Sequence, residues 1–300
     1  MIAEASAARL LAALVLAGGT ALGVERLTEA RGFLPPGFLR PWRRVAALAV
    51  LCGIFFVGIF LPVVLFGLER PPLAVEDLST PGLFLLQGLL VLSLVVWFLL
   101  GYAVGTPDPA AEPALPPAAE TEAPRPVASG PESLASAFAR QLGLRAERPL
   151  AELGLGLAAG AAGWVVAILL MLAVVALVWA LGGQELLPTE PPELIPWIAG
   201  LSLAVRIAIA VTAGVVEELF FRGFLQPRAG IALSSALFVL AHLSYEQPFM
   251  LVGIAALSLL FAWLVRWRGN VLAAIVAHAT FDLIQLLIVV PQVLKHLQGG

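Results

Sequence analysis

The sequence predicts an all-α protein, a polytopic transmembrane helix bundle with about eight spans. Of its 300 residues, 60% are hydrophobic and only 12% are charged. Several apolar runs are longer than the ~18 residues that mark a helix able to cross a hydrocarbon core of about 30 Å. A soluble core helix of that length would carry a polar face, and these runs carry none. We therefore expect an integral, multi-pass membrane protein.

The charges of the loops support this span count. Basic loops alternate with acidic or neutral ones along the chain, as the positive-inside rule requires. The pattern predicts that both termini lie on the outer side and that the basic loops lie in the cytoplasm. The predicted spans are residues 8–24, 45–67, 82–105, 153–182, 195–217, 230–243, 249–265 and 270–290.

Residues 1–105 hold the first three spans and are expected to form an N-terminal unit. The first apolar run resembles a secretory signal in its position. However, Glu4 and Arg9 lie in its leading segment, and its apolar part continues to about Val24. A retained first span is therefore favoured over a cleaved signal.

Residues 106–150 differ in composition from the rest of the chain. The stretch "TPDPAAEPALPPAAETEAPRPVASGPE" is rich in Pro, Ala and Glu, which predicts an extended, disordered cytoplasmic linker. After it, Leu134, Phe138 and Leu142 recur at helical spacing among arginines, which predicts a short helix on the membrane surface. This segment separates the N-terminal unit from a five-span unit, residues 151–300.

The fourth predicted span carries Gly156, Gly160 and Gly163 at helical intervals. Helices in lipid gain little from hydrophobic association, so small residues let them pack by close contact. We expect a packing seam along this face.

Charge and cysteine content exclude two kinds of site. The formal net charge is −3, and no basic stripe indicates a nucleic-acid partner. Cys52 is the only cysteine, so an intramolecular disulfide and a cysteine-based metal site are both excluded.

Ionisable residues interrupt the apolar runs of the last hundred residues. On insertion scales, an ionised side chain at mid-bilayer costs at least ~2.5–3.5 kcal/mol, so it persists only where it meets partners in a protein interior or a wet cavity. The first four spans carry almost no such charge. The interrupting residues are Glu217, Glu218, Arg222, His242, His278 and Asp282.

Helical spacing orients these groups. Glu218 and Arg222 are four residues apart, as are His278 and Asp282, so each pair shares one helix face. Glu217 points roughly 100° away from Glu218 and is free to face a different cavity. The simplest arrangement turns four side chains toward one buried, hydrated pocket: Glu217, His242, His278 and Asp282.

A carboxylate and two imidazoles in a low-dielectric site favour hydrolysis of an amide bond. Desolvation makes a carboxylate a better general base for water. One histidine can hold that water, and the other can donate a hydrogen bond to the oxyanion that forms when water attacks a carbonyl. No serine, threonine or cysteine motif competes with this arrangement.

Three motifs on successive apolar segments resemble those of the CAAX protease and bacteriocin-processing (CPBP) family of intramembrane proteases, which includes the type II CAAX prenyl endopeptidases. "EELFFR" matches EExxxR, "FVLAH" matches FxxxH and "HATFD" matches HxxxN/D, over a core of residues 195–290. The resemblance implies a water held between Glu217 and His242, with His278 and Asp282 stabilising the oxyanion. Glu218 and Arg222 would then fix the geometry of Glu217.

Asp282 departs from family members that carry asparagine at this position. An ionised aspartate cannot donate a hydrogen bond and would repel an oxyanion. Two interpretations remain open at this point. Either Asp282 stays protonated in its apolar setting, or it accepts from His278 and orients it.

Other interpretations of these residues also remain open. Glu218 with Arg222 is consistent with a structural ion pair, and Phe238 is expected to pack around the site. Zn²⁺ held by Glu217, His242 and His278 would make a metal-dependent variant, although no HExxH motif is present. A transporter or a non-catalytic membrane partner, such as an immunity protein, is the alternative from another functional class.

The expected partners follow from the membrane setting. We expect a membrane protein or lipidated peptide as substrate, a lipid bilayer of a bacterial inner or plasma membrane as the surroundings, and no nucleic acid. The sequence does not determine whether the substrate is prenylated, what the first three spans do, or the oligomeric state.

Overall fold

In the computed structural model, described for residues 2–66, 79–103, 133–187, 194–243 and 250–298, the chain is a bundle of helices without strands in these ranges. The predicted all-α, polytopic fold class is confirmed. The N-terminal helices are α1 (Ile2–Ala30), α2 (Pro41–Phe55), α3 (Leu61–Phe66) and α4 (Thr80–Phe98). The later helices are α5 (Leu134–Gln141), α6 (Pro149–Ala180), α7 (Leu194–Gly200), α8 (Leu203–Glu217), α9 (Gln226–Ala229), α10 (Ile231–Ala241), α11 (Met250–Arg268), α12 (Leu272–Ile284) and α13 (Val290–Gln298).

Among the described residues, six helical segments are long and apolar enough to cross a membrane, compared with about eight predicted spans. They contain α1, α2 with α3, α4, α6, α11, and α12 with α13. The predicted fifth span corresponds to α8 and its continuation, whose apolarity is reduced by ionisable side chains. The predicted sixth span corresponds to α10, which is apolar but has only 11 residues.

The sequence predicted that the fifth span ends at Glu217, but the helix that contains this residue, α8, continues beyond it. It continues through a π-helical segment, η7 (Glu218–Leu225), into α9 and turns only at Gly230, where φ is +89°. The glycine and proline in "RGFLQPRAG" therefore do not break the helix before that turn. As a result, Glu217 and His242 lie at a similar depth, both roughly 18–20 Å along their helices from this turn at 1.5 Å per residue.

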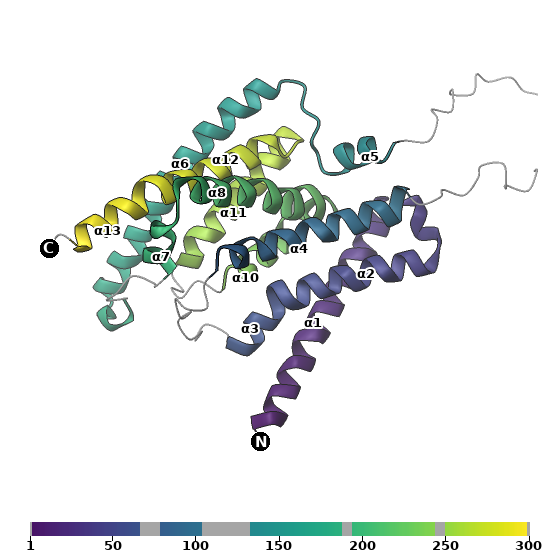
Figure 1. Ribbon diagram of the computed structural model, residues 1–300, viewed down its shortest axis with the longest axis horizontal. Coiled ribbons are helices and arrows are strands. Elements are labelled where there is room, and N and C mark those ends of the chain that lie inside the picture. Colours follow the sequence, from purple (N-terminus) through teal and green to yellow (C-terminus); the bar gives the residue numbers. More distant parts are fainter. Residues whose placement is uncertain (1, 67–78, 104–132, 188–193, 244–249, 299–300) are drawn as a thin grey trace, which may run out of the picture.

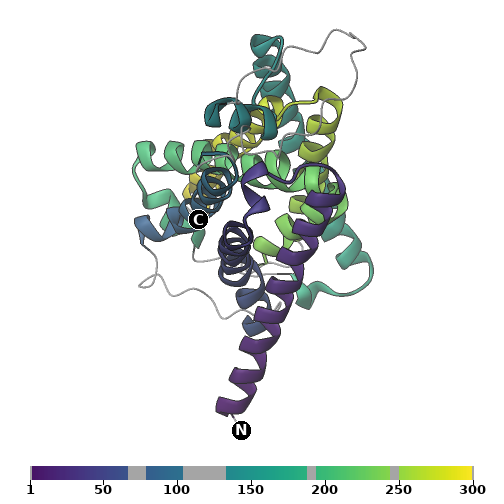
Figure 2. The same ribbon diagram turned by 90° about the vertical axis from the view of Figure 1, so that its right-hand side faces the viewer.

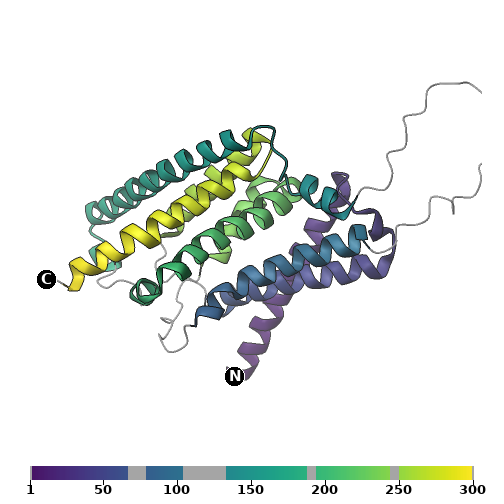
Figure 3. The same cartoon turned by 45° about the horizontal axis from the view of Figure 1, so that its top comes forward.

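Helix α12 lies between α6 and α8, and the three run side by side (Figure 3). Gly160 on α6 and Gly214 on α8 make this packing possible. A Cβ built on Gly160 would lie 2.4 Å from the carbonyl oxygen of Ala277, and one on Gly214 would lie 2.7 Å from the amide nitrogen of Ala279. The packing seam predicted on α6 is present, and α12, the helix that it contacts, carries His278 and Asp282.

Helices α1, α2 and α4 pack against the other side of the bundle (Figures 1 and 2). One hydrophobic core contains residues of these helices together with aromatic residues of η7 and α10. Phe55 of α2 contacts Phe220 edge to face at 6.4 Å, and Trp97 of α4 contacts Phe224 at 5.0 Å. The N-terminal helices therefore support the segment that follows Glu217.

The predicted helix after the linker is present as α5, whereas residues 104–132 of the predicted linker lie outside the described residues. A buried hydrogen-bond chain holds α5 against the bundle. Gln141 donates to the hydroxyl of Tyr102 at 2.7 Å and accepts from the guanidinium of Arg228 at 2.7 Å. Arg228 also donates to the carbonyl of Phe224 at 2.9 Å. We call this end of the molecule, which includes α5, Arg228 and the C-terminal end of α11, the basic end.

The seam between α6 and α12 yields a first prediction. Gly160→Ala should lower the free energy of unfolding by about 1–3 kcal/mol, because the added methyl group meets backbone atoms of α12 that cannot move independently. Thermal unfolding of the detergent-purified protein measures the change. Gly154→Ala is the matched control on the same helix, since a Cβ there meets nothing within 4 Å. Equal stability of the two variants would contradict the proposed seam.

Candidate active site

Four helices bring the predicted polar residues together. The C-terminal end of α8 and the start of η7 supply the two glutamates, the C-terminal end of α10 supplies His242, and α12 supplies His278 with Asp282. Helix α11 closes the group with Ser258 and Phe261. Segments 60 residues apart in the chain thus meet at one place inside the bundle.

Glu217 faces His242. The Oε2 atom of Glu217 lies 3.7 Å from Nε2 of His242. The other ring nitrogen, Nδ1, lies 2.7 Å from the carbonyl oxygen of Phe238. Because a carbonyl only accepts, Nδ1 carries the proton, and Nε2 is the nitrogen presented to Glu217. Within the part of the chain that is described, Glu217 Oε2 is buried and has no hydrogen-bond donor.

Glu218 has different partners from Glu217, because adjacent positions on a helix point roughly 100° apart. Its Oε2 atom lies 3.4 Å from Nε of Arg222, and both side chains are fully buried. Arg222 donates further to Ser258 on α11, at 3.2 Å to the hydroxyl and 3.3 Å to the backbone carbonyl. The ring of Phe238 lies 4.2 Å from the guanidinium carbon, within the range of a cation–π contact.

His278 lies between two carboxyl groups. Its Nδ1 atom is 2.9 Å from Oε1 of Glu218, and its Nε2 atom is 3.6 Å from Oδ2 of Asp282. The ring of Phe261 stacks on the imidazole with a centroid distance of 5.1 Å. Hydrogen bonding and stacking together fix the plane of this ring.

Phe238 packs at the centre of the group, where the sequence placed it. Its ring lies 4.5 Å from that of His242 and 6.0 Å from that of His278. It therefore packs against both imidazoles, and its ring also contacts the guanidinium of Arg222.

Exposure separates these residues into two sets. The side chains of Glu218 and Arg222 are 0% exposed, whereas those of His242 and Asp282 are 18% and 24% exposed. Glu217, with a side chain 11% exposed, lies between them. The buried pair of Glu218 and Arg222 can therefore only support the site. The three partly exposed side chains can contact water or a bound molecule.

Sequence reasoning missed three features of this group. It predicted that Glu218 fixes the geometry of Glu217, whereas the side chain of Glu218 forms a hydrogen bond with His278. It also missed Ser258, whose only signal was a hydroxyl within an apolar span. Phe261 carried no signal, because a phenylalanine is ordinary in a membrane helix.

A metal interpretation requires three donors around one point. Glu217, His242 and His278 do not form such a group, and no other set of three histidine, cysteine or acidic side chains does so within the described ranges. His278 instead directs Nδ1 to Glu218, which separates it from the pair formed by Glu217 and His242. The donor set expected for Zn²⁺ is therefore not assembled in this conformation.

Comparison with known families identifies the segment that contains these residues. Residues 199–284 match the family model described as "Type II CAAX prenyl endopeptidase Rce1-like". This segment is similar to the Rce1-like family. The match confirms the family resemblance seen in the three motifs, and it includes every polar residue of the group described above.

A relative among curated proteins covers a similar length. The uncharacterized protein YpbD of Bacillus subtilis (strain 168) is 32% identical over 89 residues, which are 29% of this chain and 43% of YpbD. The chain therefore spans less than half of the length of this relative. No solved structure matches the chain.

The buried pair of Glu218 and Arg222 yields a second prediction. Arg222→Met should lower the free energy of unfolding by about 3–5 kcal/mol, because it leaves a buried carboxylate without its cation. The double variant Glu218→Gln with Arg222→Met should lose less, because no unpaired charge remains.

Chemical denaturation of the purified protein in detergent measures both losses. Arg26→Met serves as the control, since the Arg26 side chain is 81% exposed. A double variant less stable than the single variant would show that the pair is not the source of the effect.

Proposed function

We propose that this protein is an intramembrane endopeptidase that hydrolyses peptide bonds of membrane-associated substrates. One observation carries the proposal: a buried carboxylate oxygen of Glu217, without a donor in the described residues, lies 3.7 Å from Nε2 of His242 inside a segment that matches an endopeptidase family.

The pairing of these two atoms favours a bound water molecule. With Nδ1 donating to Phe238, a neutral His242 presents a lone pair at Nε2, and an ionised Glu217 presents lone pairs at Oε2. Two acceptors at 3.7 Å do not hydrogen bond to each other, whereas one water can donate a proton to each. Such a water is oriented with its oxygen outward, and Glu217 is then the general base that accepts its proton during attack on a carbonyl carbon.

His278 and Asp282 are proposed to stabilise the oxyanion formed by that attack. Because Nδ1 of His278 donates to Glu218, only Nε2 remains to face the substrate. The ring is proposed to be charged, because an imidazole donates from both nitrogens only in that form. In this arrangement Glu218 orients the ring, and a protonated Asp282 is proposed to donate a hydrogen bond to the oxyanion beside Nε2. Glu217 then passes the proton taken from the water to the leaving amine.

The site is proposed to open toward the cytoplasm. The positive-inside rule favours a cytoplasmic position for the basic end of the bundle, and Glu217 and His242 lie roughly 18–20 Å from Gly230 at the rise of a helix. A substrate must therefore be able to enter the bilayer with its scissile bond, as a membrane protein or a lipidated peptide does. A bacterial inner or plasma membrane is the expected location.

A cleavage assay tests the proposed activity. Glu217→Gln should reduce cleavage at least ~10²-fold, because the amide keeps the shape of the side chain but accepts no proton from water. The substrates are membrane-borne peptides in proteoliposomes, each in a prenylated and an unmodified form. Glu147→Gln is the matched control, since Glu147 is exposed and outside the site.

The same assay distinguishes the other functions. Equal cleavage by wild type and Glu217→Gln would overturn the assignment and leave binding or transport as the better explanation. Dialysis against a tight chelator should leave the wild-type rate unchanged. A loss that Zn²⁺ restores would instead support the metal-dependent variant held by Glu217, His242 and His278.

A further inference from the structure

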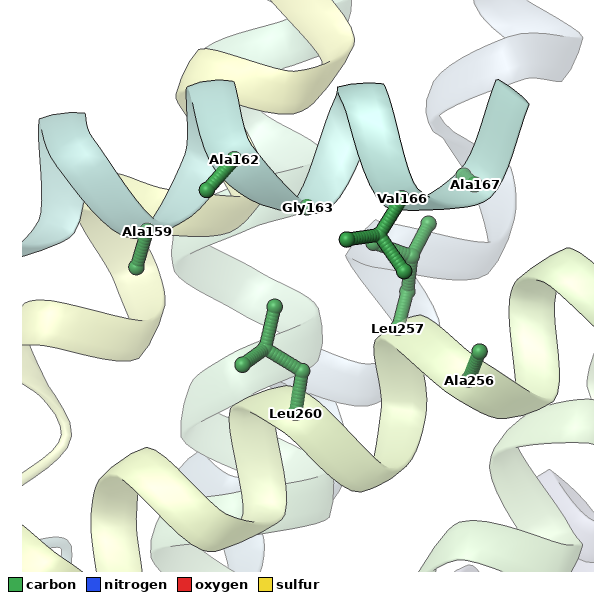
Figure 4. A pocket seen from close by; sticks show the side chains of 8 residues that line it. All are labelled: Ala159, Ala162, Gly163, Val166, Ala167, Ala256, Leu257 and Leu260. Atoms are coloured by element: carbon green, nitrogen blue, oxygen red, sulfur yellow. The ribbon is translucent and has the colours of Figure 1, made fainter. Parts of the chain in front are cut away.

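An apolar groove of about 180 Å³ lies between α6 and α11, away from the polar site. Figure 4 shows Leu257 and Leu260 of α11 directed toward α6, with Ala159, Ala162 and Gly163 on the facing wall. Small side chains on α6 create the hollow, since a Cβ on Gly163 would already lie 3.0 Å from Leu260. The volume is below the ~300–1,000 Å³ of drug-sized pockets, so it suits a stretch of a single hydrocarbon chain.

Aromatic and basic side chains follow the groove toward the basic end. On α11, Ala256, Leu260, Trp263 and Trp267 recur at intervals of three or four residues and so share one helix face. The two indoles stack at 5.0 Å and are 53% and 54% exposed. Tryptophans in this position mark the level of lipid headgroups.

An exposed arginine completes this rim. Arg268 is engaged, because it forms a bidentate ion pair with Glu152 of α6. Arg266 is exposed and lies three residues beyond Trp263. At a helical rise, Arg266 stands roughly 9 Å along α11 from Leu260. Its direction on α11 is roughly 60° from that of Trp263 and 120° from that of Leu260, so its long, exposed side chain stands at the level of the two indoles, beside the groove face.

We propose that this groove is a binding site for one anionic phospholipid of the surrounding bilayer. An acyl chain occupies the hollow between α6 and α11, the glycerol region packs on Trp263 and Trp267, and the phosphate pairs with Arg266. The matched family segment ends at the polar site and does not include α6, so the groove belongs partly to a region outside it.

The position of the groove favours a bilayer lipid over the lipid group of a substrate. Ser258 and Leu260 are two positions apart on α11, so their side chains point roughly 160° apart. Ser258 accepts from Arg222 in the site, while Leu260 lines the groove. A chain in the groove therefore lies behind α11 as seen from Glu217, where it supports that helix without meeting the scissile bond.

Lipid retention by the full-length protein tests the proposal. Wild-type protein extracted from vesicles of equal phosphatidylglycerol and phosphatidylcholine should retain phosphatidylglycerol preferentially in native mass spectrometry. Ala256→Phe and Ala162→Phe, which fill the groove from opposite walls, should each retain one phospholipid fewer per protein. Leu259→Phe should behave as wild type, since Leu259 is 54% exposed and lies outside the lining.

The headgroup contact is tested separately. Arg266→Gln should reduce the preference for phosphatidylglycerol about fivefold, the effect of one basic residue at a membrane surface. Arg9→Gln, at an exposed position of α1, should leave the preference unchanged.

Retention of the same lipid number by both phenylalanine variants would overturn the proposal, as would equal retention of the two phospholipids by wild type. Displacement of the lipid by an equimolar farnesylated peptide would assign the groove to substrate and would also overturn it. None of these outcomes depends on whether Glu217 supports cleavage.

Discussion

An ionisable side chain inside this bundle must find a protein partner or a bound water, because the hydrocarbon core of a bilayer does not solvate it. The arrangement of Glu218, Arg222 and Ser258 follows from this constraint. The charge of Arg222 meets a carboxylate, a hydroxyl, a backbone carbonyl and an aromatic ring. With these contacts made, Glu218 still has an oxygen to hold the ring of His278. The ion pair of Glu218 and Arg222 thus allows the proposed catalytic side chains to be placed inside the bundle.

Backbone irregularity is the second requirement of the site. The π-helical turn from Glu218 to Leu225 widens the helix just where two adjacent glutamates must reach different partners. Another such turn, η8 (Gln285–Val289), follows α12, the helix that carries His278. There the carbonyl of Leu286 accepts from Arg206 of α8, and Gln285 accepts from Trp164 of α6. One backbone carbonyl and one side-chain amide of this turn therefore join the helix that carries His278 to α8 and α6.

The N-terminal helices and α5 hold the basic end together. Arg228 is fully buried and joins α5 to the segment that begins at Glu217, and Arg31 donates to the carbonyl of Pro227 at 2.9 Å. At the far side of the same end, Glu152 and Arg268 join α6 to α11. These contacts limit the movement of the helices relative to one another, and the site depends on helices α8, α10, α11 and α12 keeping their register. A lipid bound in the groove between α6 and α11 would also limit the movement of these two helices.

Local patterns in the sequence determined the fold class, the pairing of Glu218 with Arg222 and of His278 with Asp282, and the glycine seam on α6. Each depends on hydropathy or on spacings of three and four residues within one helix, which fix relative direction on that helix alone. Only the tertiary structure decided that Glu217 faces His242, that Glu218 holds His278, and that Ser258 and Phe261 belong to the site. Those contacts join separate helices, whose rotation and depth depend on packing between them. For the same reason the sequence predicted that the fifth span ends at Glu217. Polar residues that pair with neighbouring helices resemble the end of a span when each helix is considered alone.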